Sequence, residues 1–136
     1  MSDFHTIDVH RSEGLVRLTL NRPDAANGIN AEMARELAAA AAACDDPTVK
    51  VVVITGAGRF FSAGGDLKDF ASAPHRGRHL KGVADDLHRA ISTLARCDAV
   101  VITAVNGAAA GAGFSLAVLG DLTLAAESAS FTMAYT

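Results

Sequence analysis

The sequence has no tryptophan and no run of lysine and arginine, only 5% of its residues are aromatic, and its formal net charge is −3. Nucleic-acid binding needs a basic surface and, for single strands, aromatic side chains on which bases stack. We therefore expect no nucleic-acid partner. The two cysteines, Cys44 and Cys97, lack a CxxC spacing. They are too few for a disulfide scaffold, which predicts two reduced and mostly buried thiols.

Targeting and membrane signals are also scarce. The start, Met1 to His5, has neither the basic residues nor the apolar run of a signal peptide, so we expect a cytoplasmic protein. The segment from Ala99 to Gly120 contains no charged residue, so by length and lack of charge it resembles a transmembrane helix. However, this stretch begins with β-branched residues and contains the turn signal Asn106-Gly107. It predicts a strand, a turn and a buried helix, and no membrane partner.

What is present favours a folded α/β domain. The 136 residues are 50% hydrophobic and only 20% charged, enough for one domain with a substantial core. Period-two alternation predicts a hairpin of residues 4–10 and 15–20. The other predicted strands cover residues 49–55, 100–105, 121–126 and 129–132, the first of them buried on both faces. Helical spacing and capping residues predict helices over residues 31–46, 66–70, 75–96 and 111–119. Asn30 is the predicted cap of the first helix, and the third has an apolar stripe of Leu80, Val83, Leu87, Ile91 and Leu94.

The local sequence motifs disfavour several kinds of functional site. Gly56-x-Gly58 is followed by Phe61 and no helix, which disfavours a dinucleotide site, and no Gly-Lys-Ser/Thr closes a phosphate loop. Ser115 comes close to a nucleophile elbow, but it falls inside a helix and no histidine follows it. His75, His79 and His88 lack the neighbours of a metal motif, so a solvated helix face is preferred and we expect no metal.

Two glycine-rich loops remain, at residues 60–67 and 106–113. Each follows a predicted strand and leads into a predicted helix. Small residues let main-chain N–H groups approach a ligand, and two such donors can hold the negative charge that develops on a carbonyl oxygen. The alternative is that both loops only permit tight packing of strand against helix. The residues alone leave these two interpretations open.

A series of motifs in order decides between them. It consists of LNRPDAANGIN (20–30), VVITG (52–56), FFSAGGDL (60–67) and AVNGAAAGAG (104–113), followed by Gly120-Asp121. This series resembles the crotonase superfamily of enoyl-CoA hydratases and isomerases. The resemblance implies an α/β fold built as a crotonase-like spiral of ββα units, a homotrimer or dimer of trimers, and acyl-CoA thioester substrates. No permanently bound cofactor is implied, since coenzyme A arrives as part of the substrate.

The resemblance also assigns residues. The oxyanion donors would be the backbone N–H groups of Gly65 and Ala112. Candidates for contact with the CoA thioester lie in the loops around them and after the Asn-Arg-Pro segment. These candidates are Asp24, Ala26, Ala63, Gly65, Asp66, Leu67, Lys68 and Ala112. Asp66 can also cap a helix, and the two roles are compatible.

The departures from the family pattern concern the catalytic carboxylates. Hydratases place two carboxylates around one water, and the matching positions here are Ser115 and Tyr135, neither of which is a strong base near neutral pH. We therefore favour double-bond isomerisation through an enolate. The alternatives are a catalytically inactive acyl-CoA-binding or assembly protein, and a thioester hydrolase with water placed by Asp69 or Ser115. The chain ends directly after a predicted strand, so we expect residues 1–136 to be the N-terminal part of a longer domain.

Overall fold

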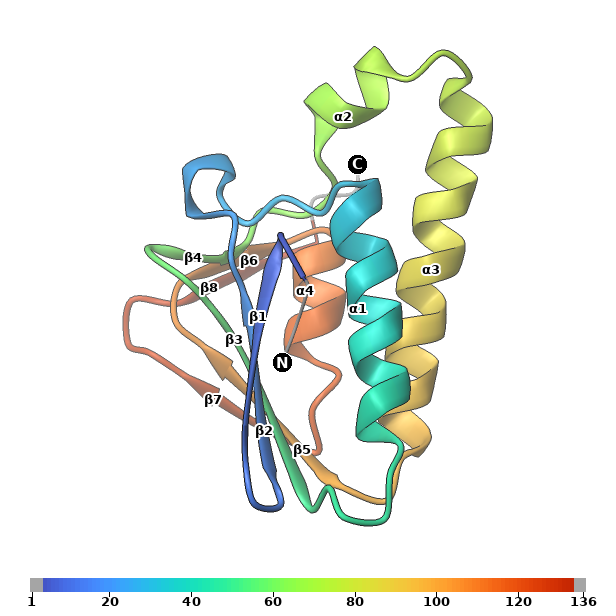
Figure 1. Cartoon of the computed structure of the whole chain (residues 1–136). Helices are drawn as coiled ribbons and strands as arrows, with labels where there is room; N and C mark the ends of the chain where they lie inside the picture. The colour runs from blue at the N-terminus through green and yellow to red at the C-terminus, as the bar shows by residue number, and fades with distance from the viewer. Residues whose placement is uncertain (1–3, 134–136) are drawn as a thin grey trace.

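The computed structural model describes residues 4–133. It contains two sheets and a layer of helices (Figure 1). The larger sheet has the order β1-β2-β3-β5-β7, and the smaller one has the order β4-β6-β8. The strands are β1 (Ile7–Ser12), β2 (Leu15–Leu20), β3 (Val51–Gly56), β4 (Phe60–Ser62), β5 (Val100–Val105), β6 (Ala108–Ala110), β7 (Leu122–Ala125) and β8 (Ser130–Thr132). The helices are η1 (Pro23–Ala25), α1 (Ala31–Cys44), α2 (Leu67–Ser72), α3 (Arg76–Arg96) and α4 (Ala112–Ala117).

The order of elements produces a spiral. Strands β3, β5 and β7 lie side by side in the large sheet and pair in parallel, and the strands that follow them, β4, β6 and β8, do the same in the small sheet. Helices α2 and α3 follow β4, and α4 follows β6. Each repeat therefore adds one strand to each sheet before the chain returns through a helix. This confirms the predicted α/β spiral of ββα units.

Local sequence explains where the elements begin and end. β1 and β2 form the predicted antiparallel hairpin. The side chain of Asn30 accepts a hydrogen bond of 2.8 Å from the N–H of Met33 and so caps α1, which ends at Cys44, before Pro47. Asp66 caps α2 in the same way, with bonds from the N–H groups of Lys68 and Asp69. The predicted caps of both helices are thus confirmed.

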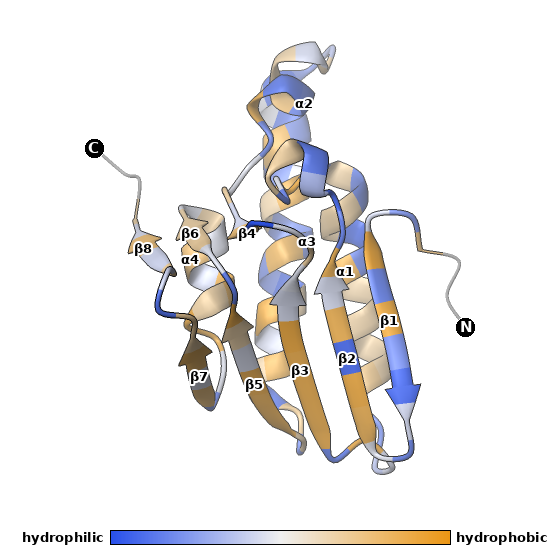
Figure 2. Ribbon diagram, turned by 90° about the vertical axis from the view of Figure 1, so that its left-hand side faces the viewer, coloured by the Kyte–Doolittle hydropathy of each residue, from blue (hydrophilic) through white to orange (hydrophobic). Residues whose placement is uncertain are grey.

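The core lies between the large sheet and the pair α1 and α3 (Figure 1). In β3, Val52 and Ile54 are buried while Val51 and Val53 are only half-buried. The prediction that this strand is buried on both faces was therefore wrong. The physical reason is visible in Figure 2, where the helices cover one face of the large sheet and the strands present their other face to the viewer.

Two strands were missed. β4 and β6 lie in segments that the sequence assigned to loops, because a three-residue strand carries almost no periodicity and alanine has a low strand propensity. They form because their backbones pair in parallel with each other.

The predicted helix over residues 111–119 is the shorter α4, and its serine, Ser115, lies inside that helix as expected. Among the described residues, no helix combines the length and apolar character that crossing a bilayer requires.

Both cysteines are free. Cys44 is buried and Cys97 half-buried, close to the predicted pair of reduced thiols. Burial and the neighbouring Cys97 raise the pKa of the Cys44 thiol to about 11, against a smaller lowering by Arg11. Cys44 is therefore a protonated core side chain near neutral pH and not a nucleophile.

Candidate active site

The two glycine-rich loops pack backbone to backbone where β4 and β6 pair. A Cβ at Gly107 would overlap the carbonyl oxygen of Arg59, and one at Gly113 would overlap that of Ser62. A Cβ at Gly64, where φ is +99°, would lie 2.8 Å from the carbonyl oxygen of Ala110. Small residues are therefore needed for close packing, as one of the two sequence interpretations held. That requirement does not exclude the other interpretation, because close packing also brings the two loops to one place.

Where the two loops meet, two backbone N–H groups have no acceptor among the described residues. The N–H of Ile29 and the carbonyl of Ile29 bond to Gly64 and Asp66, so the chain on either side of Gly65 is fixed. Among residues 4–133, the N–H groups of Gly65 and Ala112 have no hydrogen-bond acceptor. Ala112 is the first residue of α4, where an N–H has no partner inside the helix. Both groups are thus available to a ligand oxygen.

The two donors belong to one cavity of about 490 Å³. Its walls come from the two loops, from α2 and α3, and from the start of α4, and most of them are apolar. The lining residues with polar side chains are His88 and Ser115, and the other residues of the wall include Ile29, Leu67, Phe70, Leu80, Leu87 and Ile91. A cavity of this size with an apolar wall and a few polar groups fits a small acyl group next to a polar carbonyl.

Four of the eight predicted CoA contacts line this cavity, namely Ala63, Gly65, Leu67 and Ala112. Leu67 is 78% exposed, so its side chain lies at the rim of the cavity. Ala63 is joined to another of the predicted residues, because its N–H donates to the carbonyl of Ala26 over 3.0 Å. Asp24 and Lys68 are exposed on the surface nearby.

Asp66 does not line the cavity. Its carboxylate lies 2.9 Å from the guanidinium of Arg22, and the two side chains are 14% and 23% exposed. Partial burial acts to raise the pKa of Asp66, but hydrogen bonds from the N–H of Asp69, from Arg22 and from the N–H of Lys68 outweigh it and hold that pKa below its usual value. The ion pair fastens the Asn-Arg-Pro segment to the loop that carries Gly65.

Asn27 strengthens the same junction. It is fully buried, and its side chain bonds to the N–H of Arg22 and to the carbonyls of Ala57 and Phe60 over 2.8–3.0 Å. The hydroxyl of Ser62 donates to the carbonyl of Asn27 and accepts from the N–H of Gly64. The Asn-Arg-Pro motif, which in the sequence looks like a surface loop, therefore holds the residue before the first donor in place.

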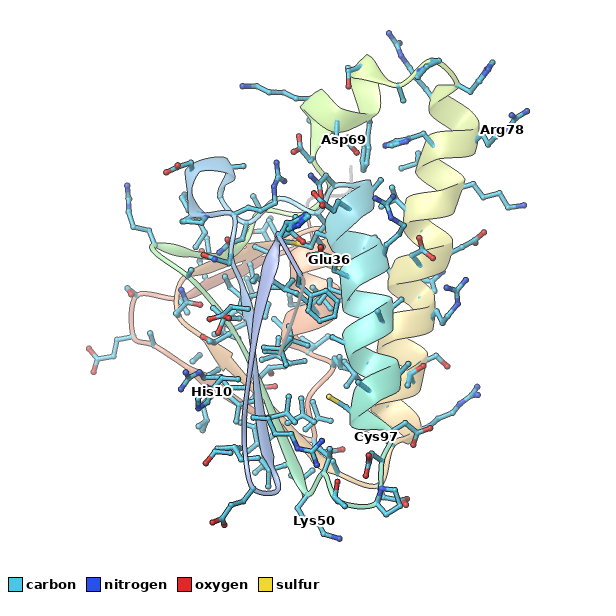
Figure 3. All side chains as sticks on the ribbon, viewed as in Figure 1. His10, Glu36, Lys50, Asp69, Arg78 and Cys97 are labelled. Atoms are coloured by element: carbon cyan, nitrogen blue, oxygen red, sulfur yellow. The ribbon has the colours of Figure 1, made fainter. Side chains whose placement is uncertain are left out.

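The residues considered for catalysis have different surroundings. Ser115 is half-buried and lines the cavity. Tyr135 lies outside the described residues. Asp69 does not line the cavity. Its side chain lies between α2 and the start of α3 (Figure 3), where its carboxylate accepts a hydrogen bond from the N–H of Ala31 over 3.1 Å and lies 2.7 Å from His79 on α3. Asp69 therefore holds three helices together, and the structure gives no support to it as the residue that places a water.

His88 was undervalued at the sequence level, where it counted only as part of a histidine group on the long helix. The structure separates that group: His75 is exposed at the start of α3, His79 contacts Asp69, and His88 lines the cavity. The helical spacing could have predicted this position of His88. Ala84, His88 and Ile91 follow one another at steps of four and three residues, so they share one side of α3.

Comparison with known proteins agrees with this geometry. A family model described as enoyl-CoA hydratase/isomerase matches residues 10–136. A probable enoyl-CoA hydratase of Rhodobacter capsulatus is 41% identical over 134 residues, covering 98% of this chain and 51% of that protein. The 1,2-epoxyphenylacetyl-CoA isomerase of Escherichia coli is 42% identical over 132 residues, covering 93% of this chain and 49% of that protein. The chain thus spans about half the length of the curated relatives it matches.

Solved structures give the same result. The crystal structure of an enoyl-CoA hydratase/isomerase from Mycobacterium paratuberculosis superposes with a TM-score of 0.85 at 39% identity, covering 96% of this chain and 53% of that one. An enoyl-CoA hydratase from Mycobacterium avium subsp. paratuberculosis has a TM-score of 0.86 at 33% identity. The agreement of motifs, spiral topology and family match identifies the chain as a member of the enoyl-CoA hydratase/isomerase family, within the crotonase superfamily.

Proposed function

We propose that this protein acts on acyl-CoA thioesters and stabilises an enolate of the acyl group. The supporting observation is the pair of N–H groups, those of Gly65 and Ala112, on the wall of one apolar cavity and without acceptors among the described residues. When a proton leaves the α-carbon of a thioester, negative charge moves to the carbonyl oxygen. Two fixed donors facing that oxygen lower the barrier, because they are oriented before the charge develops.

The coenzyme A portion would occupy the surface next to the cavity mouth. Ala63 and Leu67 lie in the first donor loop and Lys68 follows it. Asp24 and Ala26 lie in the segment that the Arg22–Asp66 ion pair fastens to this loop. On this arrangement Asp66 acts by holding the loop and not by touching the substrate. No other cofactor is required for the proposed chemistry.

Isomerisation of a double bond is the reaction that we favour. Ser115, at one of the two hydratase carboxylate positions, lines the cavity but cannot act as a strong base, and Tyr135 at the other position is no carboxylate either. Isomerisation needs one group that moves a proton between two carbons, whereas hydration needs a positioned water as well. Relatives carry both kinds of name: one is called a probable enoyl-CoA hydratase and another an isomerase.

Two alternatives lead to different measurements. A catalytically inactive acyl-CoA-binding or assembly protein would bind thioesters across a range of chain lengths without isomerising, hydrating or hydrolysing them. A thioester hydrolase would release free CoA thiol, and Ser115 is the candidate to place its water. By resemblance to the family, we also expect a homotrimer or a dimer of trimers in the cytoplasm.

The donor at Ala112 offers a direct test. Proline at the first position of a helix is compatible with helical geometry, so Ala112→Pro removes the N–H with little further change. We expect turnover of an enoyl-CoA substrate to fall by about 100-fold to 1,000-fold, as for the loss of one oxyanion donor. The measurement is kcat/KM together with the melting temperature.

Ala112→Gly is the matched control, because glycine changes the side chain but retains the N–H group. It should keep most of the activity. If Ala112→Pro folds and turns over acyl-CoA at the rate of the unsubstituted protein, the assignment of Ala112 as a donor is wrong.

A further inference from the structure

The cavity that holds the N–H groups of Gly65 and Ala112 has one titratable side chain on its wall among the described residues, that of His88. Gly65, Ala112 and Ser115 line the same cavity, and the rest of the wall is largely aliphatic or aromatic. No hydroxyl or amide is a strong base near neutral pH, whereas an imidazole both accepts and releases a proton there. The group that moves a proton in this cavity is therefore to be sought first at His88.

Helix α3 borders both the core and the cavity. Val83, Leu87 and Leu94 are buried in the core. Val83 and Leu87 also line the cavity, together with Leu80, Ala84, His88 and Ile91. Of the α3 residues in the cavity wall, His88 is the one with a polar side chain.

The imidazole of His88 is also unengaged. Within residues 4–133 it takes part in no hydrogen bond and no ion pair, whereas His79 on the same helix contacts the carboxylate of Asp69 at 2.7 Å. On its own helix the neighbouring charged residues are Asp85 and Arg89, and Arg89 pairs with Asp86. The loops, α2 and α4 contribute no titratable side chain to the cavity wall. His88 is exposed, and it lines the cavity that would receive the acyl group.

We infer that His88 is the proton-transfer residue of this site, an inference that rests on the proposed function. A ring nitrogen of neutral His88 takes the α-proton of the acyl group. The electron pair of that C–H bond forms the enolate, whose oxygen receives hydrogen bonds from Gly65 and Ala112. The imidazolium then returns a proton to the γ-carbon of a conjugated enolate, which shifts the double bond and restores the neutral ring. In D₂O, return of a solvent deuteron to the α-carbon gives exchange without isomerisation.

The test follows exchange and binding separately. The purified protein is incubated in D₂O with butyryl-CoA, octanoyl-CoA and phenylacetyl-CoA, and deuterium at the α-carbon is followed by mass spectrometry. Binding of each thioester is measured by calorimetry. For His88→Gln we expect an unchanged melting temperature, binding within about twofold, and exchange slower by about 100-fold or more, the usual contribution of a general base.

Two further variants exclude a purely structural role. Exchange lost in His88→Ala should return when free imidazole is added, because the small side chain leaves room for an external base. His75→Gln changes an exposed histidine of the segment that begins α3, away from the cavity, and should leave exchange unchanged.

The possible outcomes are distinguishable. Exchange at the unsubstituted rate in His88→Gln overturns the inference about His88 and leaves the proposed function standing. Loss of binding along with exchange, or no rescue of His88→Ala by imidazole, also overturns it, because His88 would then only shape the cavity. An unsubstituted protein that binds thioesters without exchange rejects the enolate chemistry of the proposed function, and this inference with it, in favour of a binding protein. One that binds none of the three thioesters rejects the proposed function, and this inference with it.

Discussion

Gly107 and Gly82 differ in what surrounds them, and the difference can be measured. A Cβ at Gly107 would overlap the backbone of Arg59, where the two loops of the site pack together, whereas a Cβ at Gly82 would meet nothing within 4 Å. Gly107→Ala should lower the free energy of unfolding by about 1–3 kcal/mol, since backbone atoms must shift. Chemical denaturation measures this change, and a loss of thioester binding should accompany it.

Gly82→Ala is the control for that substitution. Gly82 lies in the interior of α3 and is exposed. Alanine is a better helix former than glycine, so we expect a gain of about 0.5–1 kcal/mol. Equal effects of the two substitutions would contradict the close backbone contact between the loops.

At the scale of elements, the Arg22–Asp66 ion pair joins the segment after β2 to the cap of α2. Asp66→Asn retains an oxygen that can cap the helix but removes the charge. We expect a loss of about 1–2 kcal/mol of stability at neutral pH, because the pair is partly screened from water. Asp24→Asn, at an exposed position in η1, should have almost no effect.

The effect of Asp66→Asn should also depend on pH, and the sign follows from the pKa. Hydrogen bonds and Arg22 hold the pKa of folded Asp66 below its ordinary value. Its charge therefore stabilises the fold above the unfolded pKa, near 3.9, and this contribution disappears as the pH falls through the lower, folded pKa. The difference in stability between the two proteins should shrink below about pH 4. A difference that grows on acidification would contradict the assignment.

The elements also show how far helical periodicity can be interpreted. The spacing of Leu80, Val83, Leu87, Ile91 and Leu94 correctly predicted α3. It did not separate the residues that enter the core from those that line the cavity: Leu80 is 50% exposed and Leu94 is 2% exposed. Periodicity fixes which side of a helix is apolar, but the partner of each residue depends on what packs there.

At the scale of the whole molecule, the last repeat of the spiral is poorly covered. Strands β7 and β8 carry exposed apolar side chains, including Leu122, Leu124 and Phe131, which are 42–63% exposed. The resemblance to the family predicts a homotrimer or dimer of trimers. We expect light scattering to give a mass in solution that is a multiple of three subunits. A monomer at every concentration tested would contradict that prediction.

The sequence by itself determined the type and order of the longer elements. The alternation of residues 15–20, the cap at Asn30 and the β-branched stretch 100–105 each carry a local signal, because capping and periodicity act between residues that are close in the chain. The series of motifs likewise determined the family. Strands β4 and β6 could not be predicted from the sequence, because they exist only through pairing with each other.

Only the tertiary structure decided how the site is assembled. It placed the unpaired N–H groups of Gly65 and Ala112 on one cavity, engaged Asp66 and Asp69 in holding the helices and loops, and brought His88 to the cavity wall. These relations join residues tens of positions apart, so they depend on the packing of two sheets and three helices and not on spacing along the chain. The sequence named the loops that would form the site, and the packing selected which of their groups remain available to a substrate.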